Sequence, residues 1–173
     1  MTKSRLFTRP HARTATRVLG AISLLVIGGV HYQQYHYDFY SSIPTIGPLF
    51  LLNAISGIAL GLFLIIPFRP KLGRSDRLLD QFAALSGIGV AAGGLAGLLV
   101  SEHTPLFGFM EHGYRFAIVL AITADSAAIV LLALFLVFAR AQRATRPHHH
   151  RPDWQHTHGA QLQPDRTGAR PGL

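Results

Sequence analysis

Histidine and glutamate residues gather in two stretches of this chain, and their side chains are of the types that bind metal ions. The first stretch, HYQQYHYDFY, occupies positions 31–40, and the second contains the dipeptide Glu-His twice. Imidazole and carboxylate groups suit Zn²⁺, Cu²⁺ or Fe²⁺. The candidate metal ligands are His31, His36, Glu102, His103, Glu111 and His112.

The spacing of these residues matches no short metal-binding motif such as HExxH. An interfacial polar network that satisfies loop backbone groups is the favoured alternative to a metal site. Haem ligation would require two facing histidines deep within two helices. Only His31 lies deep in an apolar segment, so haem between His31 and His103 is disfavoured but stays open.

The composition predicts that these residues belong to a membrane protein. Only 14% of the residues are charged, against about 25% in soluble domains. The mean hydropathy is +0.30. Cysteine is absent, which excludes disulfides, thiolate metal sites and CxxC redox chemistry.

Four apolar segments are long enough to cross the hydrocarbon core as helices, which takes about 20 residues. We therefore predict an all-α membrane protein with four transmembrane helices in an up-down-up-down bundle. A basic segment, 1–17, precedes the transmembrane domain, 18–140, and a His-, Arg- and Pro-rich tail, 141–173, is expected to be disordered. The predicted spans are residues 18–37, 48–66, 82–100 and 116–139.

The basic residues predict the orientation of the spans. Fifteen of the 16 Lys and Arg residues lie before 18–37, between 48–66 and 82–100, or after 116–139. The positive-inside rule then places both termini in the cytoplasm. The sequence thus indicates a multi-pass protein of the bacterial cell (inner) membrane. Its partners are the lipid bilayer and a membrane protein or a second copy, and the charge placement disfavours nucleic acid.

The polar residues His31, Asn53 and Asp125 lie at depth within the predicted spans. His31 lies about 10 Å below the outer boundary, and Asp125 lies near the midplane. Polar groups at such depth normally face the bundle interior. On a helix His31 shares a face with Tyr35, and Tyr32 shares another with His36. One of these two pairs is expected to face inward.

Asp125 permits two interpretations of equal weight. A protonated carboxyl that hydrogen-bonds across helices would act as structural glue, with His31, Asn53, Ser56 or Ser86 as its partner. Intramembrane carboxylates also carry protons or cations in transport. A carrier usually has more ionisable residues along its path, and Asp125 is the only acidic, Lys or Arg residue inside the spans.

Aromatic residues concentrate at the predicted outer interface, where amphipathic rings are favoured. The outer-interface tyrosines are Tyr32, Tyr35, Tyr37 and Tyr40.

Small residues recur at helical spacing and predict close helix packing. The third span carries Ser86, Gly89, Gly93 and Gly97, the second carries Gly57 and Gly61, and the fourth carries Ala117, Ala121, Ala124 and Ala128. Space for a cofactor or quinone beside the third span is the less favoured alternative.

The stretches YSSIPTIGPLFLLNAISGIALGL and GFMEHGYRFAIVLAITADSAAIVLL, with HYQQYHYDFY before them, resemble a family of small four-span integral membrane proteins from high-GC Gram-positive bacteria. The resemblance covers residues 18–140, and its most specific part is 43–53. It implies the four-helix plan and assigns no catalytic residue.

Three functional hypotheses follow. The first, which leads, is a non-enzymatic membrane component with a polar and aromatic site near its outer face. The second is a metal- or haem-binding redox accessory that uses the outer histidines. The third is a small proton-coupled carrier centred on Asp125.

Overall fold

The computed structural model describes residues 9–66, 74–105, 107 and 116–144 as four long helices and one short 3₁₀ turn. The elements are α1 (Arg9–Tyr37), η1 (Tyr40–Ser42), α2 (Ile46–Ile65), α3 (Arg74–His103) and α4 (Phe116–Ala144). The described part of the chain contains no strand. The all-α prediction is therefore confirmed, and most of the predicted tail, 145–173, lies outside the described residues.

Each of the four helices is long and apolar enough to cross a membrane. Large apolar side chains cover their outward faces, where a water-soluble protein would carry polar residues. Those more than half exposed include Leu52, Ile55, Leu85, Val130 and Val137. The prediction of four helices of membrane-spanning length and composition is confirmed.

The helices extend beyond the predicted spans at the end where α1 begins. α1 begins at Arg9 instead of residue 18, and α3 begins at Arg74 instead of residue 82. The difference arises because hydropathy marks only the apolar part of a helix, while Arg itself favours helical structure. The charged turns make contacts at this end. Arg17 Nη1 lies 3.7 Å from Asp80 Oδ2, and the Arg13 guanidinium lies 5.3 Å from the Phe135 ring centroid.

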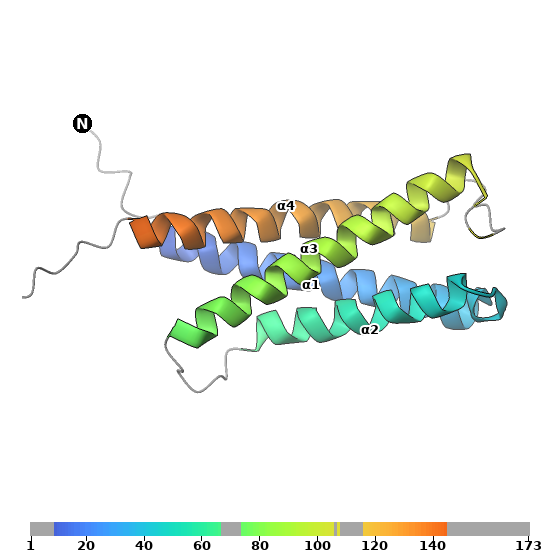
Figure 1. Ribbon diagram of the computed structural model, residues 1–173, viewed down its shortest axis with the longest axis horizontal. Helices are drawn as coiled ribbons and strands as arrows, with labels where there is room; N and C mark the ends of the chain where they lie inside the picture. The colour runs from blue at the N-terminus through green and yellow to red at the C-terminus, as the bar shows by residue number, and fades with distance from the viewer. Residues whose placement is uncertain (1–8, 67–73, 106, 108–115, 145–173) are drawn as a thin grey trace, which may run out of the picture.

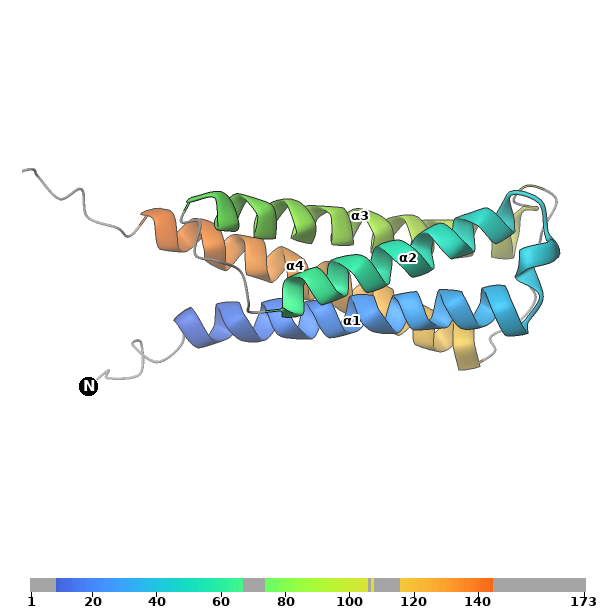
Figure 2. The ribbon, with the colours of Figure 1, turned by 90° about the horizontal axis from the view of Figure 1, so that it is seen from below.

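Each helix lies beside the next one along the chain, and α1 also lies beside α4 (Figures 1 and 2). α1 and α3 are diagonal to each other and barely touch. The core is centred on side chains from α1 and α4 that solvent does not reach: Leu24, Leu132 and Phe135. α1 is therefore the helix around which the bundle is built.

The closest helix approach is between α1 and α2, and glycines make it possible. A Cβ added to Gly57 would stand 2.8 Å from the Leu24 carbonyl oxygen, and one on Gly61 would stand 2.9 Å from that of Ala21. Gly28 of α1 is equally confined, because a Cβ added to it would stand 2.9 Å from the Ala54 carbonyl oxygen. The predicted role of Gly57 and Gly61 in close packing is confirmed.

The corresponding prediction for α3 is wrong at two of its four positions. A Cβ on Gly89 or Gly93 would meet no atom within 4 Å. α3 has small residues on two faces, and residue spacing alone does not tell which of them turns inward. The face that does carries Ala84, Gly87, Ala91 and Gly94.

The small residues of α4 fulfil their predicted role in part. Ala124 and Ala128 are buried in the bundle. Ala117 and Ala121, nearer the start of α4, are half-buried and border a cavity.

Candidate functional site

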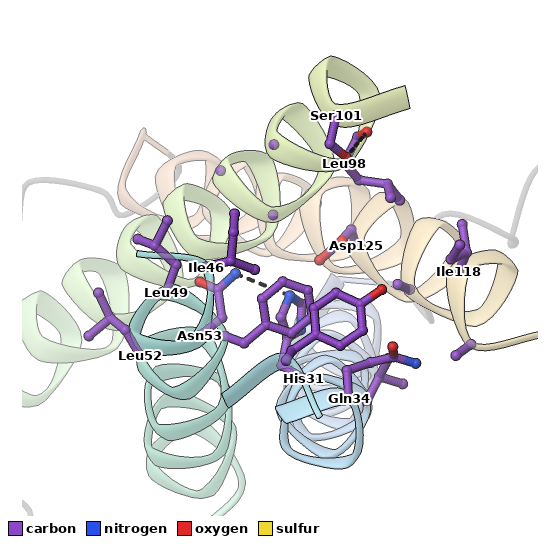
Figure 3. Close-up of a pocket in the computed structure, with 18 residues that line it drawn as sticks. His31, Gln34, Ile46, Leu49, Leu52, Asn53, Leu98, Ser101, Ile118 and Asp125 are labelled. Carbon is purple, nitrogen blue, oxygen red and sulfur yellow. Dashed lines mark hydrogen bonds between the residues drawn. The ribbon is translucent and has the colours of Figure 1, made fainter. Parts of the chain in front are cut away.

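A cavity of about 290 Å³ lies between the four helices, in the half of the bundle nearer η1 (Figure 3). Its walls are mostly apolar and include Ile46, Leu49 and Ile118. All four helices also contribute a polar side chain. These polar side chains are His31 and Gln34 of α1, Asn53 of α2, Ser101 of α3 and Asp125 of α4.

His31 is buried and engaged through both ring nitrogens. Its Nδ1 lies 2.9 Å from the Ile27 carbonyl oxygen, and its Nε2 lies 3.2 Å from Asn53 Nδ2. A carbonyl only accepts and an amide NH₂ only donates, so Nδ1 carries the proton and Nε2 accepts. This arrangement requires a neutral imidazole. The bond to Asn53 links α1 to α2.

Asn53 and Asp125 face each other across a glycine. The position of a Cβ on Gly94 would be 3.4 Å from Asn53 Nδ2 and 3.4 Å from Asp125 Oδ2. A methyl group at position 94 would be in van der Waals contact with both polar groups, and a longer side chain would occupy the space between them. Gly94 therefore leaves space between the polar groups of α2 and α4.

Two buried polar atoms in the walls have no hydrogen-bond partner in the described part of the chain: Gln34 Nε2 and Asp125 Oδ1. Gln34 is 5% exposed and Asp125 is 1% exposed. Buried polar groups are nearly always hydrogen-bonded, so each such atom requires an explanation. The glue interpretation needs a bond across helices, and Asp125 Oδ1 makes none to a described residue. Ser101 differs, because its hydroxyl donates to the Leu98 carbonyl oxygen at 2.8 Å.

Aromatic rings close the cavity on the η1 side. The His31 ring lies 5.1 Å from that of Phe50, and Phe50 in turn stacks on Tyr40 at 4.8 Å. Tyr40 is only 6% exposed. It therefore lies inside the molecule, whereas the sequence placed it in an interfacial belt.

A strained turn holds Tyr40 in this position. Thr45 has φ 70° and ψ −48°, and the Ile46 amide donates to the Pro44 carbonyl oxygen at 2.8 Å. This is a γ-turn of the rare positive-φ kind. It brings Gly47 against η1, where an added Cβ would lie 2.9 Å from the Tyr40 carbonyl oxygen. Gly47 therefore allows the start of α2 to lie close against η1.

The other predicted tyrosines follow the expected division of α1. Tyr32 and His36 are exposed and stack on each other at 5.8 Å. Tyr35, on the side of buried His31, is half-buried. The inward pair is thus His31 and Tyr35. Tyr37 ends α1 and is 66% exposed.

The structure does not bring the described candidate metal ligands together. His36 is stacked on the surface, and the exposed His103 pairs its Nδ1 with the Leu99 carbonyl oxygen at 2.8 Å. No group of three His, Asp or Glu able to hold a metal ion exists among the described residues, which include Glu102. Glu111 and His112 lie outside the described residues. His31 has no free nitrogen for a metal or haem iron in this arrangement.

Gln34 and Ser101 belong to the cavity, and sequence reasoning missed both. Gln34 follows His31 by three residues, so the two share a helical face. That spacing was a usable signal once His31 was placed inward. Ser101 carried no comparable signal, since it ends an apolar run that has small residues on several faces.

Comparison with protein-family models, with curated proteins and with solved structures found no match to this chain.

Proposed function

We propose that this protein is a non-enzymatic membrane component that binds a small lipid-soluble molecule in the cavity between its helices. The observation that carries the proposal is the pair of buried, unpartnered atoms Gln34 Nε2 and Asp125 Oδ1 in an otherwise apolar wall. Small-molecule sites are mostly apolar cavities in which a few polar groups orient the ligand. A bound molecule would supply the missing hydrogen bonds.

The proposal includes a location and an orientation. The chain would lie in the bacterial cell (inner) membrane as an up-down-up-down bundle, with both termini cytoplasmic. The uneven distribution of basic residues supports this orientation through the positive-inside rule. The cavity, at the η1 end, would then lie in the outer half of the bilayer. Reporter fusions to both termini test this, and a periplasmic signal from either would overturn it.

The binding proposal is tested by recovering the molecule. Protein purified in a mild detergent is extracted with organic solvent, and the extract is analysed by mass spectrometry. Ala121→Phe fills the cavity wall, while Ala133→Phe makes the same change on an exposed face of α4. We expect the wild-type protein and Ala133→Phe each to yield one compound, at nearly one mole per mole of protein. The same compound should be depleted from Ala121→Phe. Equal recovery from both variants would overturn the proposal.

A proton-coupled carrier is the second candidate, and the position of Asp125 favours it. A carboxyl that is 1% exposed and borders a cavity is expensive to maintain without a function. Proteoliposomes that carry an internal pH dye measure the proton flux. We expect Asp125→Asn to abolish the flux if the chain is a carrier. A flux that Asp125→Asn leaves unchanged would eliminate this candidate.

A further inference from the structure

We infer that the cavity takes a neutral, hydroxyl-bearing molecule from the lipid phase, and that this molecule enters sideways between α2 and α3. The inference rests on the proposed binding function and specifies its ligand. It follows from three features of the cavity: the hydrogen-bonding capacity of its orphan atoms, its charge, and the side on which its wall is thin.

The orphan atoms favour a group that both donates and accepts hydrogen bonds. Gln34 Nε2 is an amide nitrogen, so it only donates. Asp125 Oδ1 accepts when the carboxyl is ionised, and the carboxyl can also donate when it is protonated. A hydroxyl matches either state of Asp125, because it has one donor and two acceptor positions. A ketone, an ester or an ether only accepts, so it matches an ionised Asp125 poorly.

The charge of the cavity favours a neutral head group. None of the described residues that line it is Lys or Arg, and both nitrogens of neutral His31 are engaged. A phosphate or carboxylate would lie beside Asp125 without a cation, which is costly in an apolar surrounding. An ammonium group would suit Asp125, but it has no acceptor for Gln34.

The size of the cavity limits how much of the ligand it holds. Its volume of about 290 Å³ lies at the lower end of the range for small-molecule sites, about 300–1,000 Å³. The cavity therefore accommodates a head group and a short apolar segment. A longer chain would continue into the surrounding lipid, next to the apolar side chains on the outer faces of the helices.

The wall is thinnest between α2 and α3. Leu49 and Leu52 of α2 both line the cavity, yet they are 42% and 59% exposed. On α3, Gly93 lines the cavity and has open space where a side chain would be. The η1 side is covered by stacked Tyr40 and Phe50. The opening thus faces the bilayer, which suits a lipid-soluble ligand.

Ligand class is tested with four probes on one farnesyl chain and one phenolic probe on a decyl chain. Purified protein in lipid nanodiscs is titrated with radiolabelled farnesol, and unlabelled farnesyl methyl ether, farnesyl phosphate, farnesylamine and decylhydroquinone compete for binding. We expect farnesol or decylhydroquinone to bind at least about tenfold more tightly than the ether, which has lost the hydroxyl donor. The better of the two identifies an aliphatic or a phenolic hydroxyl. Tighter binding of the ether, the phosphate or the amine would overturn the inference.

Two variants link the preference to the orphan atoms. Asp125→Leu should remove the preference for farnesol over its methyl ether, because the acceptor for the hydrogen bond that the hydroxyl donates is lost. Gln34→Leu should weaken both ligands equally, because both accept from Nε2. A preference that survives Asp125→Leu would overturn the inference. If Asp125→Leu does not fold, the effect of Gln34→Leu on both ligands decides.

A matched pair on α3 tests the lateral route. Gly93→Leu and Gly89→Leu both place a side chain in open space, but only Gly93 lines the cavity. We expect Gly93→Leu to slow association of radiolabelled farnesol at least about tenfold, and Gly89→Leu to leave it unchanged. Equal rates for both variants would overturn the route.

The outcomes separate this inference from the proposed function. A compound that is depleted from Ala121→Phe but lacks a hydroxyl would keep the binding function and overturn the inferred ligand class. Absence of any compound sensitive to Ala121→Phe would overturn both.

Discussion

Glycines on α1 and α2 and glycines on α3 have similar spacings but opposite structural roles. Where α1 crosses α2, Gly28 and Gly57 bring backbone atoms to within about van der Waals contact, so neither position has room for a Cβ. On α3, Gly89 and Gly93 have only open space around them. The same pattern of small residues thus produces a tight seam in one place and a thin wall in another.

The difference follows from what the opposite helix presents. α2 has glycines at its contact with α1, so both backbones can approach. On α3, an added Cβ at Gly87 would stand 2.9 Å from Leu132 Cδ1 of α4 and 2.9 Å from Leu24 Cδ1 of α1, so it would meet side chains instead of backbone. Gly89 and Gly93 lie away from these contacts. A glycine in a membrane helix therefore favours packing only where a partner occupies the space that its missing side chain leaves.

The largest expected effect is at the tight seam. Gly57→Leu must push α2 away from α1, because the obstructing atoms are the backbone of Leu24 and Gly28. We expect a loss of about 3 kcal/mol in the free energy of unfolding, measured by denaturant titration with circular dichroism in detergent. The control Gly89→Leu should change it by less than about 0.5 kcal/mol. Equal losses would remove the distinction between the two regions.

Adjacent glycines on α1 give a finer version of the same comparison. Gly28→Ala places a Cβ 2.9 Å from the Ala54 carbonyl oxygen, so we expect a loss of about 2 kcal/mol. Gly29→Ala meets nothing within 4 Å, and alanine stabilises a helix by up to about 1 kcal/mol relative to glycine. The same titration measures both. A Gly28→Ala protein as stable as Gly29→Ala would contradict the geometry of the seam.

The turn before α2 tests the reverse case, a residue with a side chain at a position that favours glycine. Thr45 has a positive φ of 70°, and such strain costs about 1–3 kcal/mol. Replacing Thr45 with glycine removes the strain, but glycine also loses more conformational entropy on folding, which offsets part of the stabilisation. We expect Thr45→Gly to raise the free energy of unfolding by about 1 kcal/mol. Thr123→Gly, within α4, should lower it by about 0.3 kcal/mol.

The smallest expected effect concerns the cavity wall. His31→Phe and Asn53→Leu, alone and together, form a double-mutant cycle on the hydrogen bond between α1 and α2. Double-mutant cycles on interhelical hydrogen bonds in membranes give coupling energies of about 0.6 kcal/mol on average. We expect a coupling energy of that size between His31 and Asn53. A coupling energy of zero would show that the seam holds the helices without this bond.

The four helices were predictable because an apolar run of sufficient length has few alternatives in a membrane. Their ends were not, since charged residues such as Arg13 and Asp76 continue a helix without any hydropathy signal. The predicted division of α1 into a His31 face and a Tyr32 face was correct, because helical geometry alone determines which residues share a side.

The cavity was only partly predictable. His31, Asn53 and Asp125 were singled out because polar groups are costly at depth, and all three line it. The inward face of α3 was only partly predicted. Gly89 faces open space, while Gly93 and Gly97 of the same stripe line the cavity beside Gly94. The closure of the cavity by Tyr40 depends on the Thr45 backbone, and residue type gave no sign of that conformation.

The long contact between α1 and α4 has a consequence for biosynthesis. These are the first and last of the four helices to leave the ribosome, yet Leu24 of α1 and Leu132 and Phe135 of α4 meet in one core. α2 and α3 are inserted while one side of α1 still lacks its final neighbour. The arrival of α4 completes the core and adds Asp125 to the cavity wall in the same event. The core of the bundle is therefore complete only once α4 has packed against α1.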